Sequence, residues 1–279
     1  MRRIVKLAYS TWGMADVPIE VAVPRLARMG YAGLELTILP GYTTALERLD
    51  AAARQRIPAL LREQGMTLTA LAAHSRLLDP PEYLTSITRL REAVHLAVAL
   101  DPDDPPPINT LPGGVPSEWD AVRHRVVDEY ARLGEYAAPH GVSLAIEPHV
   151  GAALSRPDQA LWLIERIGLR NVGLNVDYSH FQAIGMSVAE AVPPLAPHAL
   201  HTHIKGVTGR WPNHAFVTPG EDDFDHATYL RTMHECGYRG YETVEISKMV
   251  VARPDYEPFA HAQLAYDTLA DAARRAGIG

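Results

Sequence analysis

Residues 30–36 read Gly-Tyr-Ala-Gly-Leu-Glu-Leu, in which a glycine that suits the end of a helix is followed by a short apolar strand. Glycine at this place can take the left-handed conformation that ends a helix and turns the chain back. Residues 237–246, Gly-Tyr-Arg-Gly-Tyr-Glu-Thr-Val-Glu-Ile, resemble this junction near the other end of the chain. The two stretches predict a repeated unit in which a helix leads directly into a strand.

The same alternation runs along the whole chain, where short apolar or β-branched runs alternate with longer stretches of helical period. We predict eight strands, at residues 4–9, 33–38, 67–73, 107–111, 142–147, 172–177, 199–204 and 241–246. We predict eight helices, at residues 18–29, 44–64, 81–100, 116–138, 157–167, 187–195, 226–236 and 256–276. Eight strand–helix units of this length are typical of a single (β/α)8 barrel, here one domain over residues 1–279. A doubly wound open sheet is the alternative, but no Gly-x-Gly-x-x-Gly follows the first strand.

The composition excludes several classes of protein. The single cysteine, Cys236, rules out a disulfide framework. An excess of acid, 33 Asp and Glu against 26 Lys and Arg, gives no electrostatic footprint for a nucleic acid. No stretch of 18 uninterrupted apolar residues and no leader pattern is present. We therefore expect a cytoplasmic protein with no nucleic-acid and no membrane partner.

Carboxylates and imidazoles gather at the predicted strand ends, where the active sites of such barrels are built. The stretches in question are His74, Glu147-Pro148-His149, Asp177-Tyr178-Ser179-His180, His201-Thr202-His203-Ile204-Lys205 and Glu245-Ile246-Ser247. Each residue alone also fits a hydrogen-bonded loop or a solvated rim charge. Their coincidence at one end of successive strands favours a shared divalent metal, because each strand then supplies ligands on a rigid frame.

Several of these motifs, taken together and in this order, carry a family resemblance. They are Ile146-Glu147-Pro148, Asp177-Tyr178-Ser179-His180-Phe181, His201-Thr202-His203-Ile204-Lys205, Pro219-Gly220-Glu221-Asp222-Asp223-Phe224-Asp225 and Val244-Glu245-Ile246. The sequence resembles the xylose-isomerase-like barrel superfamily over nearly its whole length. The resemblance is to the branch of sugar (phosphate) isomerases and epimerases, which includes ketose 3-epimerases and inosose dehydratases.

The resemblance implies a site for one divalent ion, expected to be Mn²⁺ with Co²⁺ or Mg²⁺ as alternatives. Its implied ligands are Glu147, Asp177, His203 and Glu245. In the ketose epimerases the two glutamates also transfer protons on opposite faces of the sugar. His180 matches a substrate-binding histidine of that family, and Arg210 lies near the position of a substrate-binding arginine.

Other residues are candidates from their positions alone. His74, His149 and Lys205 could contact sugar hydroxyls. Glu35 could be a second base or pair with a cation. Residues 211–225 are long for a strand-to-helix connection and read as a lid. Trp12 and Trp211 could form apolar walls for a sugar.

The chemistry expected of such a site is proton abstraction next to a sugar carbonyl, through an enediolate that the metal stabilises. A sugar isomerase or epimerase acting on a sugar or cyclitol ketone is our first hypothesis. A lyase of the same superfamily, either an inosose dehydratase or a C-glycoside deglycosidase subunit, shares the first step. An apurinic endonuclease and a non-catalytic accessory barrel are further alternatives. The resemblance leaves open a homo-oligomer or a partner subunit.

Overall fold

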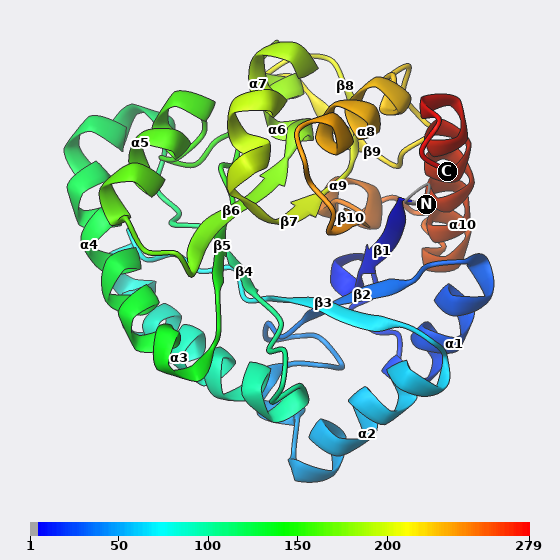
Figure 1. Ribbon diagram of the computed structural model, residues 1–279, viewed down its shortest axis with the longest axis horizontal. Helices are drawn as coiled ribbons and strands as arrows, with labels where there is room; N and C mark the ends of the chain where they lie inside the picture. Colours follow the sequence, from blue (N-terminus) through cyan, green and yellow to red (C-terminus); the bar gives the residue numbers. More distant parts are fainter. Residues whose placement is uncertain (1–4) are drawn as a thin grey trace.

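The computed structural model describes residues 5–279, in which eight parallel strands form one sheet in the order β10-β1-β2-β3-β4-β5-β6-β7 (Figure 1). The strands are β1 (Lys6–Ser10), β2 (Gly33–Thr37), β3 (Thr67–Ala72), β4 (Ile108–Thr110), β5 (Leu144–Ile146), β6 (Val172–Asp177), β7 (Ala199–His203) and β10 (Tyr241–Val244). A parallel bridge between Ile204 and Val244 joins the two ends of the sheet. The predicted single (β/α)8 barrel is therefore confirmed.

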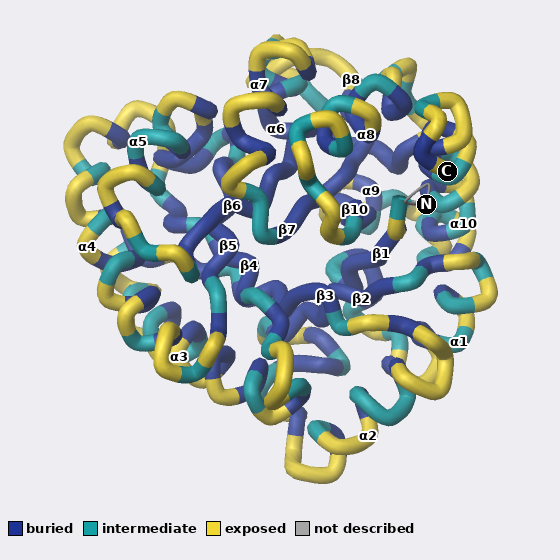
Figure 2. Tube along the Cα trace, in the orientation of Figure 1, coloured by how far each residue is buried: buried dark blue, intermediate teal, exposed yellow. Residues whose placement is uncertain are grey.

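Helices surround the barrel on its outside, and their buried faces turn toward the strands (Figures 1 and 2). The main helices are α1 (Ile19–Met29), α2 (Ala51–Glu63), α3 (Tyr83–Leu100), α4 (Trp119–Ala137), α5 (Pro157–Ile167), α7 (Val188–Leu195), α8 (His226–Glu235) and α10 (Pro258–Ala276). Gly30 ends α1 with a φ of 111°, as the opening junction predicts. Within residues 5–279, no helix combines the length and the apolar character that crossing a membrane requires.

The predicted helix at residues 44–64 is too long at its start. The structure has a 3₁₀ turn at Leu46–Arg48, and α2 begins only at Ala51. Asp50 sets this boundary, because its side chain accepts a hydrogen bond of 2.8 Å from the backbone N–H of Ala53. The start of the first predicted strand, at residue 4, lies outside the described residues.

Three short elements that the sequence did not predict lie on the side of the barrel where the strands end. They are α6 (Tyr178–Ala183), α9 (Lys248–Val251) and an antiparallel hairpin of β8 (Gly206–Thr208) and β9 (Ala215–Val217). The backbone N–H of Val207 donates to Asp222 Oδ2 at 3.0 Å, which ties the hairpin to the loop after it. The segment predicted as a lid, residues 211–225, therefore begins inside a hairpin.

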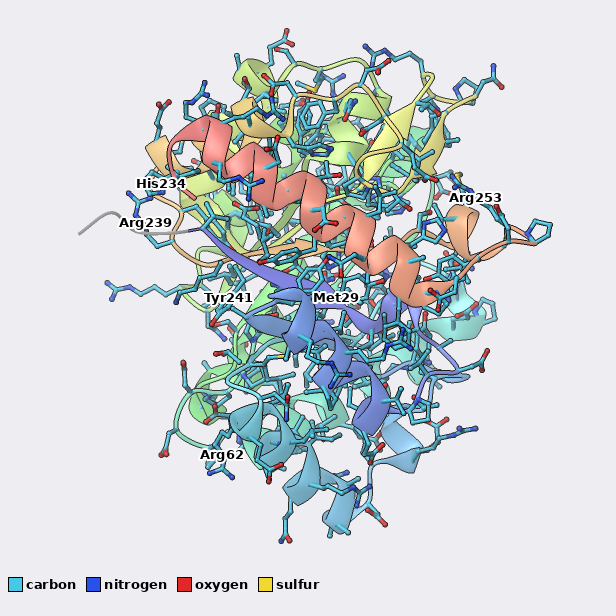
Figure 3. All side chains as sticks on the ribbon, turned by 90° about the vertical axis from the view of Figure 1, so that its right-hand side faces the viewer. Met29, Arg62, His234, Arg239, Tyr241 and Arg253 are labelled. Carbon is cyan, nitrogen blue, oxygen red and sulfur yellow. The ribbon has the colours of Figure 1, made fainter. Side chains whose placement is uncertain are left out.

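A cavity of about 780 Å³ lies between β1, β10, α8 and α10, on the outer side of the barrel wall. Figure 3 shows His234 and Arg239, which line it, close together near one end of α10. Glu242 also lines this cavity, although only 4% of the residue is exposed. Its Oε2 accepts hydrogen bonds of 3.2 Å from Thr202 Oγ1 and Tyr229 Oη. Burial raises the pKa of the Glu242 carboxyl to about 7.

This raised pKa predicts a loss of stability with rising pH. Unfolded glutamate releases its proton near pH 4.5, whereas folded Glu242 keeps it to about pH 7. The free energy of unfolding should therefore fall as pH rises through that interval, by up to about 3 kcal/mol. Glu242→Gln keeps the acceptor for Thr202 and Tyr229 and should remove this loss. Denaturant unfolding at pH 5 and pH 8 checks it, and parallel pH profiles for the two proteins would contradict it.

Candidate metal centre

Four acidic or imidazole side chains from four strand ends meet inside the barrel. Glu147 follows β5, Asp177 ends β6, His203 ends β7 and Glu245 follows β10. Each can offer one ligand atom such that all four atoms lie within 4.8 Å of one another. Each of these residues is at most 3% exposed. The structure thus brings together the four residues that the sequence singled out as a ligand set.

His203, the last residue of β7, lies inside the barrel, and its two ring nitrogens face different groups. Its Nδ1 lies 3.4 Å from Glu245 Oε2 and 3.8 Å from Glu147 Oε1. Its Nε2 lies 3.0 Å from Glu35 Oε1, on the opposite side of the ring. His203 is therefore placed between the ligand set and a further buried carboxylate.

Lys205, two residues further along the chain, places its ammonium among the same carboxylates. Its Nζ contacts Asp177 Oδ2 and Glu245 Oε2 and lies 3.9 Å from Glu147 Oε1. Burial disfavours the charged amine, but the three carboxylates outweigh it and raise the pKa of Lys205 above its ordinary value. A positive charge is therefore held where these three carboxylates converge.

The carboxylates themselves are held in the ionised form. Burial opposes ionisation of Glu147, but the hydrogen bond from His180 and the charge of Lys205 help to hold its pKa well below the ordinary value. Burial likewise opposes ionisation of Asp177, and Lys205 lowers the pKa of that group. Anionic oxygen atoms are the form that binds a divalent cation.

These residues fit a divalent metal by charge and by donor chemistry. Glu147 Oε2 is buried and forms no hydrogen bond within the described residues, which leaves it free as a ligand. Three carboxylates with one imidazole suit ions such as Mn²⁺ and Mg²⁺ better than a thiolate set would, and zinc also accepts these oxygen and nitrogen donors.

Three further histidines surround Glu147. His180, in α6, places Nε2 3.1 Å from Glu147 Oε1 and 3.4 Å from Asp177 Oδ2. His74, just past β3, places Nε2 3.3 Å from Glu147 Oε2. The ring of His149 lies 3.9 Å from that of His180, and burial together with His180 lowers its pKa to about 3, so it is neutral. Of the sequence candidates, His74 and His180 therefore meet at the Glu147 carboxylate, and His149 packs against His180.

Arg210, by contrast, lies away from the centre. It is exposed on the segment between β8 and β9, and its guanidinium donates to the Gln182 carbonyl at the end of α6. The antiparallel hairpin carries this residue outward, so it touches none of the four candidate ligands. Trp211, next to it, packs over Gly151 and is 45% exposed.

The mouth of the barrel holds a second group that the sequence reasoning left out. Lys248 donates to the Tyr42 hydroxyl at 2.7 Å, and its Nζ lies 4.9 Å from the centre of the Trp12 ring. Trp12 in turn stacks against His74, with 4.8 Å between ring centres. In the sequence, the only indication that Lys248 belongs to the site is its position three residues after Glu245. A cavity of about 540 Å³, lined by His74 and His149 among others, opens beside this group.

A family model described as "Xylose isomerase-like TIM barrel" matches residues 23–273. The chain belongs to this family. The rhizopine catabolism protein MocC of Rhizobium meliloti is 25% identical over 282 residues, which cover 94% of this chain and 84% of that protein. An inosose isomerase of Halalkalibacterium halodurans is 26% identical over 141 residues, about half the length of each (48%). A crystal structure of the IolI protein with a bound zinc atom superposes with a TM-score of 0.81 at 19% identity, covering 97% of this chain and 99% of that one.

The position of Lys205 predicts a protein whose stability depends on a cation at this centre. Lys205→Met leaves three buried carboxylates without their ammonium partner, which should cost about 3 kcal/mol or more in metal-free protein. Thermal unfolding in a chelator should therefore show a melting temperature lower by about 6 °C or more. Excess Mn²⁺ or Zn²⁺ should raise the melting temperature of the variant more than that of the wild type.

Lys6→Met, at an exposed lysine of β1, is the control and should respond to metal as the wild type does. Equal melting temperatures for Lys205→Met and the wild type in chelator would contradict the prediction.

Proposed function

We propose that this chain is a divalent-metal-dependent isomerase or epimerase that removes a proton next to the carbonyl of a sugar or cyclitol ketone. The observation that carries the proposal is the convergence of Glu147, Asp177, His203 and Glu245 from four strand ends. The inosose isomerase relative supports a cyclitol ketone as the substrate class. The relative that matches nearly the whole chain is named for rhizopine catabolism, which is consistent with a catabolic enzyme.

Glu147, Asp177, His203 and Glu245 would hold the metal. A bound divalent cation would supply Lewis acidity, which stabilises the negative charge that develops on a carbonyl oxygen when the neighbouring carbon loses its proton. We propose Mn²⁺ as the native ion, because oxygen donors dominate the set. The IolI protein, which has the same fold, binds zinc.

Glu147 and Glu245 are the proposed proton-transfer groups. Glu147 is held in the ionised form, the only form that can accept a proton from carbon. Glu245 comes from β10, three positions around the ring from β5, so the two carboxylates can approach a substrate from different sides. In epimerisation, one removes the proton and the other returns a proton to the opposite face.

His180, His74 and Lys248 are proposed to orient the substrate. His180 Nδ1 has no hydrogen-bond partner within residues 5–279, so it is free to bind a hydroxyl group. His74 and the Trp12–Lys248 pair stand at the mouth on the other side of Glu147. Neutral His149 packs behind His180 and holds its ring in place.

Glu147→Gln and Glu245→Gln test the chemistry directly. Each keeps the size of the side chain but removes the base, so turnover should fall by about 10² to 10⁴. The measurement is deuterium uptake from D₂O at the carbon next to the carbonyl, with a panel of inososes and ketoses as substrates. The wild type is expected to bind one metal ion per chain, measured on the same preparation. Glu242→Gln is the matched control. Glu242 lies in β10, three residues before Glu245, and lines the cavity on the outer side of the barrel wall.

Two results would change the proposal. If both Glu147→Gln and Glu245→Gln took up deuterium at the wild-type rate, neither residue would be the base. Deuterium uptake followed by loss of water, seen as an unsaturated or diketone product, would identify the protein as a lyase that shares the same first step.

His180→Ala should separate substrate binding from metal binding. We expect turnover to fall because a substrate contact is lost, whereas metal content measured after dialysis should stay near that of the wild type. Loss of the metal from this variant would instead place His180 among the ligands.

A further inference from the structure

Glu35 is a buried carboxylate one level below the ligand set, and the proposed proton transfers do not use it. We propose that Glu35 is a positioning residue that holds His203 in the tautomer whose Nδ1 is unprotonated and can bind the metal in place of its contact with Asn175 Nδ2. The inference rests on the metal site of the proposed function and adds to it a residue outside the ligand set.

The carboxylate of Glu35 is held on all sides by groups from other strands. The residue is fully buried in β2. Its Oε1 accepts a hydrogen bond of 2.5 Å from Ser10 Oγ. Its Oε2 lies 2.8 Å from His201 Nε2 and 3.4 Å from Asn109 Nδ2. These contacts fix the carboxylate in one orientation within the barrel.

His203 connects this carboxylate to the metal ligands through the two sides of one ring. Its Nε2 lies 3.0 and 3.1 Å from the two oxygens of Glu35. Since a carboxylate only accepts hydrogen bonds, Nε2 must carry the proton. A neutral ring protonated at Nε2 has its lone pair on Nδ1, the atom that faces Glu245 and Glu147. Carboxylate partners of this kind orient ligand histidines and raise their basicity.

The same residues could be read as a second metal site, because Glu35, His201 and His203 also offer three donor atoms within 4.8 Å of one another. One observation favours the positioning role. Glu35 already has hydrogen-bonding neighbours from β1, β4 and β7, which occupy its carboxylate oxygens.

The test compares zinc-loaded wild type with Glu35→Met and Glu35→Gln. Zinc is diamagnetic, so ¹⁵N spectra of histidine-labelled protein can report which ring nitrogen of His203 carries the proton. Chelator competition gives the zinc dissociation constant, and elemental analysis gives the ions bound per chain. Glu242→Gln is the matched control, since it alters a buried strand glutamate that does not touch His203.

We expect wild-type His203 to be protonated at Nε2 and zinc-bound at Nδ1, with one zinc per chain. Glu35→Met should weaken zinc binding about 10- to 100-fold. Its ¹⁵N spectrum should no longer show His203 as a single species protonated at Nε2. Glu35→Gln, which keeps one acceptor oxygen and is the milder change for folding, should weaken binding less. Glu242→Gln should match the wild type in both measurements.

Three results would overturn the inference, and they are distinguishable. Unchanged zinc affinity and an unchanged His203 spectrum in folded Glu35→Met or Glu35→Gln would show that Glu35 does not position the ligand. Two zinc ions per wild-type chain, one of them lost in Glu35→Gln, would make these residues a second metal site. Wild-type protein that binds no divalent ion would instead overturn the proposed metal site, and this inference with it.

Discussion

Four carboxylates buried inside one small barrel are the constraint on which the rest of this site depends. Glu35, Glu147, Asp177 and Glu245 are each at most 3% exposed. Removing ionised carboxylates from water is costly unless cations and hydrogen-bond donors replace the water. Lys205 supplies a positive charge, and Glu35 and Glu245 outweigh burial to raise the pKa of His203 well above its ordinary value. Lys205 and protonated His203 do not balance the four carboxylates, and the remaining negative charge favours the binding of a divalent cation.

Strand β7 and the residues just after it provide the cationic and imidazole partners of these carboxylates. They can do so because the side chains of a strand alternate between its two faces. His201, His203 and Lys205 are two residues apart and therefore all point into the barrel, at successive levels along its axis. A shift by one residue would turn all three outward. The closing contacts prevent this shift. The N–H of Ile204 donates to Thr243 O at 2.8 Å, and that of Glu245 donates to Ile204 O at 3.1 Å. The contacts that close the barrel thus also place Glu245 beside His203 and Lys205.

The barrel, and the convergence of Glu147, Asp177, His203 and Glu245 at its strand ends, could be predicted from the sequence because both depend on local pattern. β6 matches its predicted limits, residues 172–177, since its alternation of apolar residues ends in an aspartate at the strand end. The hairpin was missed because its two strands are three residues each, too short for a pattern, and depend on pairing with each other and on Asp222. That hairpin also explains why Arg210 faces outward. Lys205 was expected to meet the substrate, and only the three-dimensional arrangement shows that it reaches the carboxylates.

The two glutamates of the ligand set have different surroundings, and this difference bears on how they could share the work of proton transfer. Glu147 is surrounded by His180, His74 and Lys205, which favour its anion. Within residues 5–279, the salt-bridge partners of Glu245 are Lys205 and His203, and the charge of Lys248 also interacts with this carboxylate. Lys205 touches both glutamates, so any movement of its ammonium toward one weakens its hold on the other. A substrate or metal that displaced Lys205 would remove one contact from each carboxylate, whereas His180 and His74 would stay beside Glu147. The histidines thus keep Glu147 in the ionised form, at the expense of its affinity for a proton.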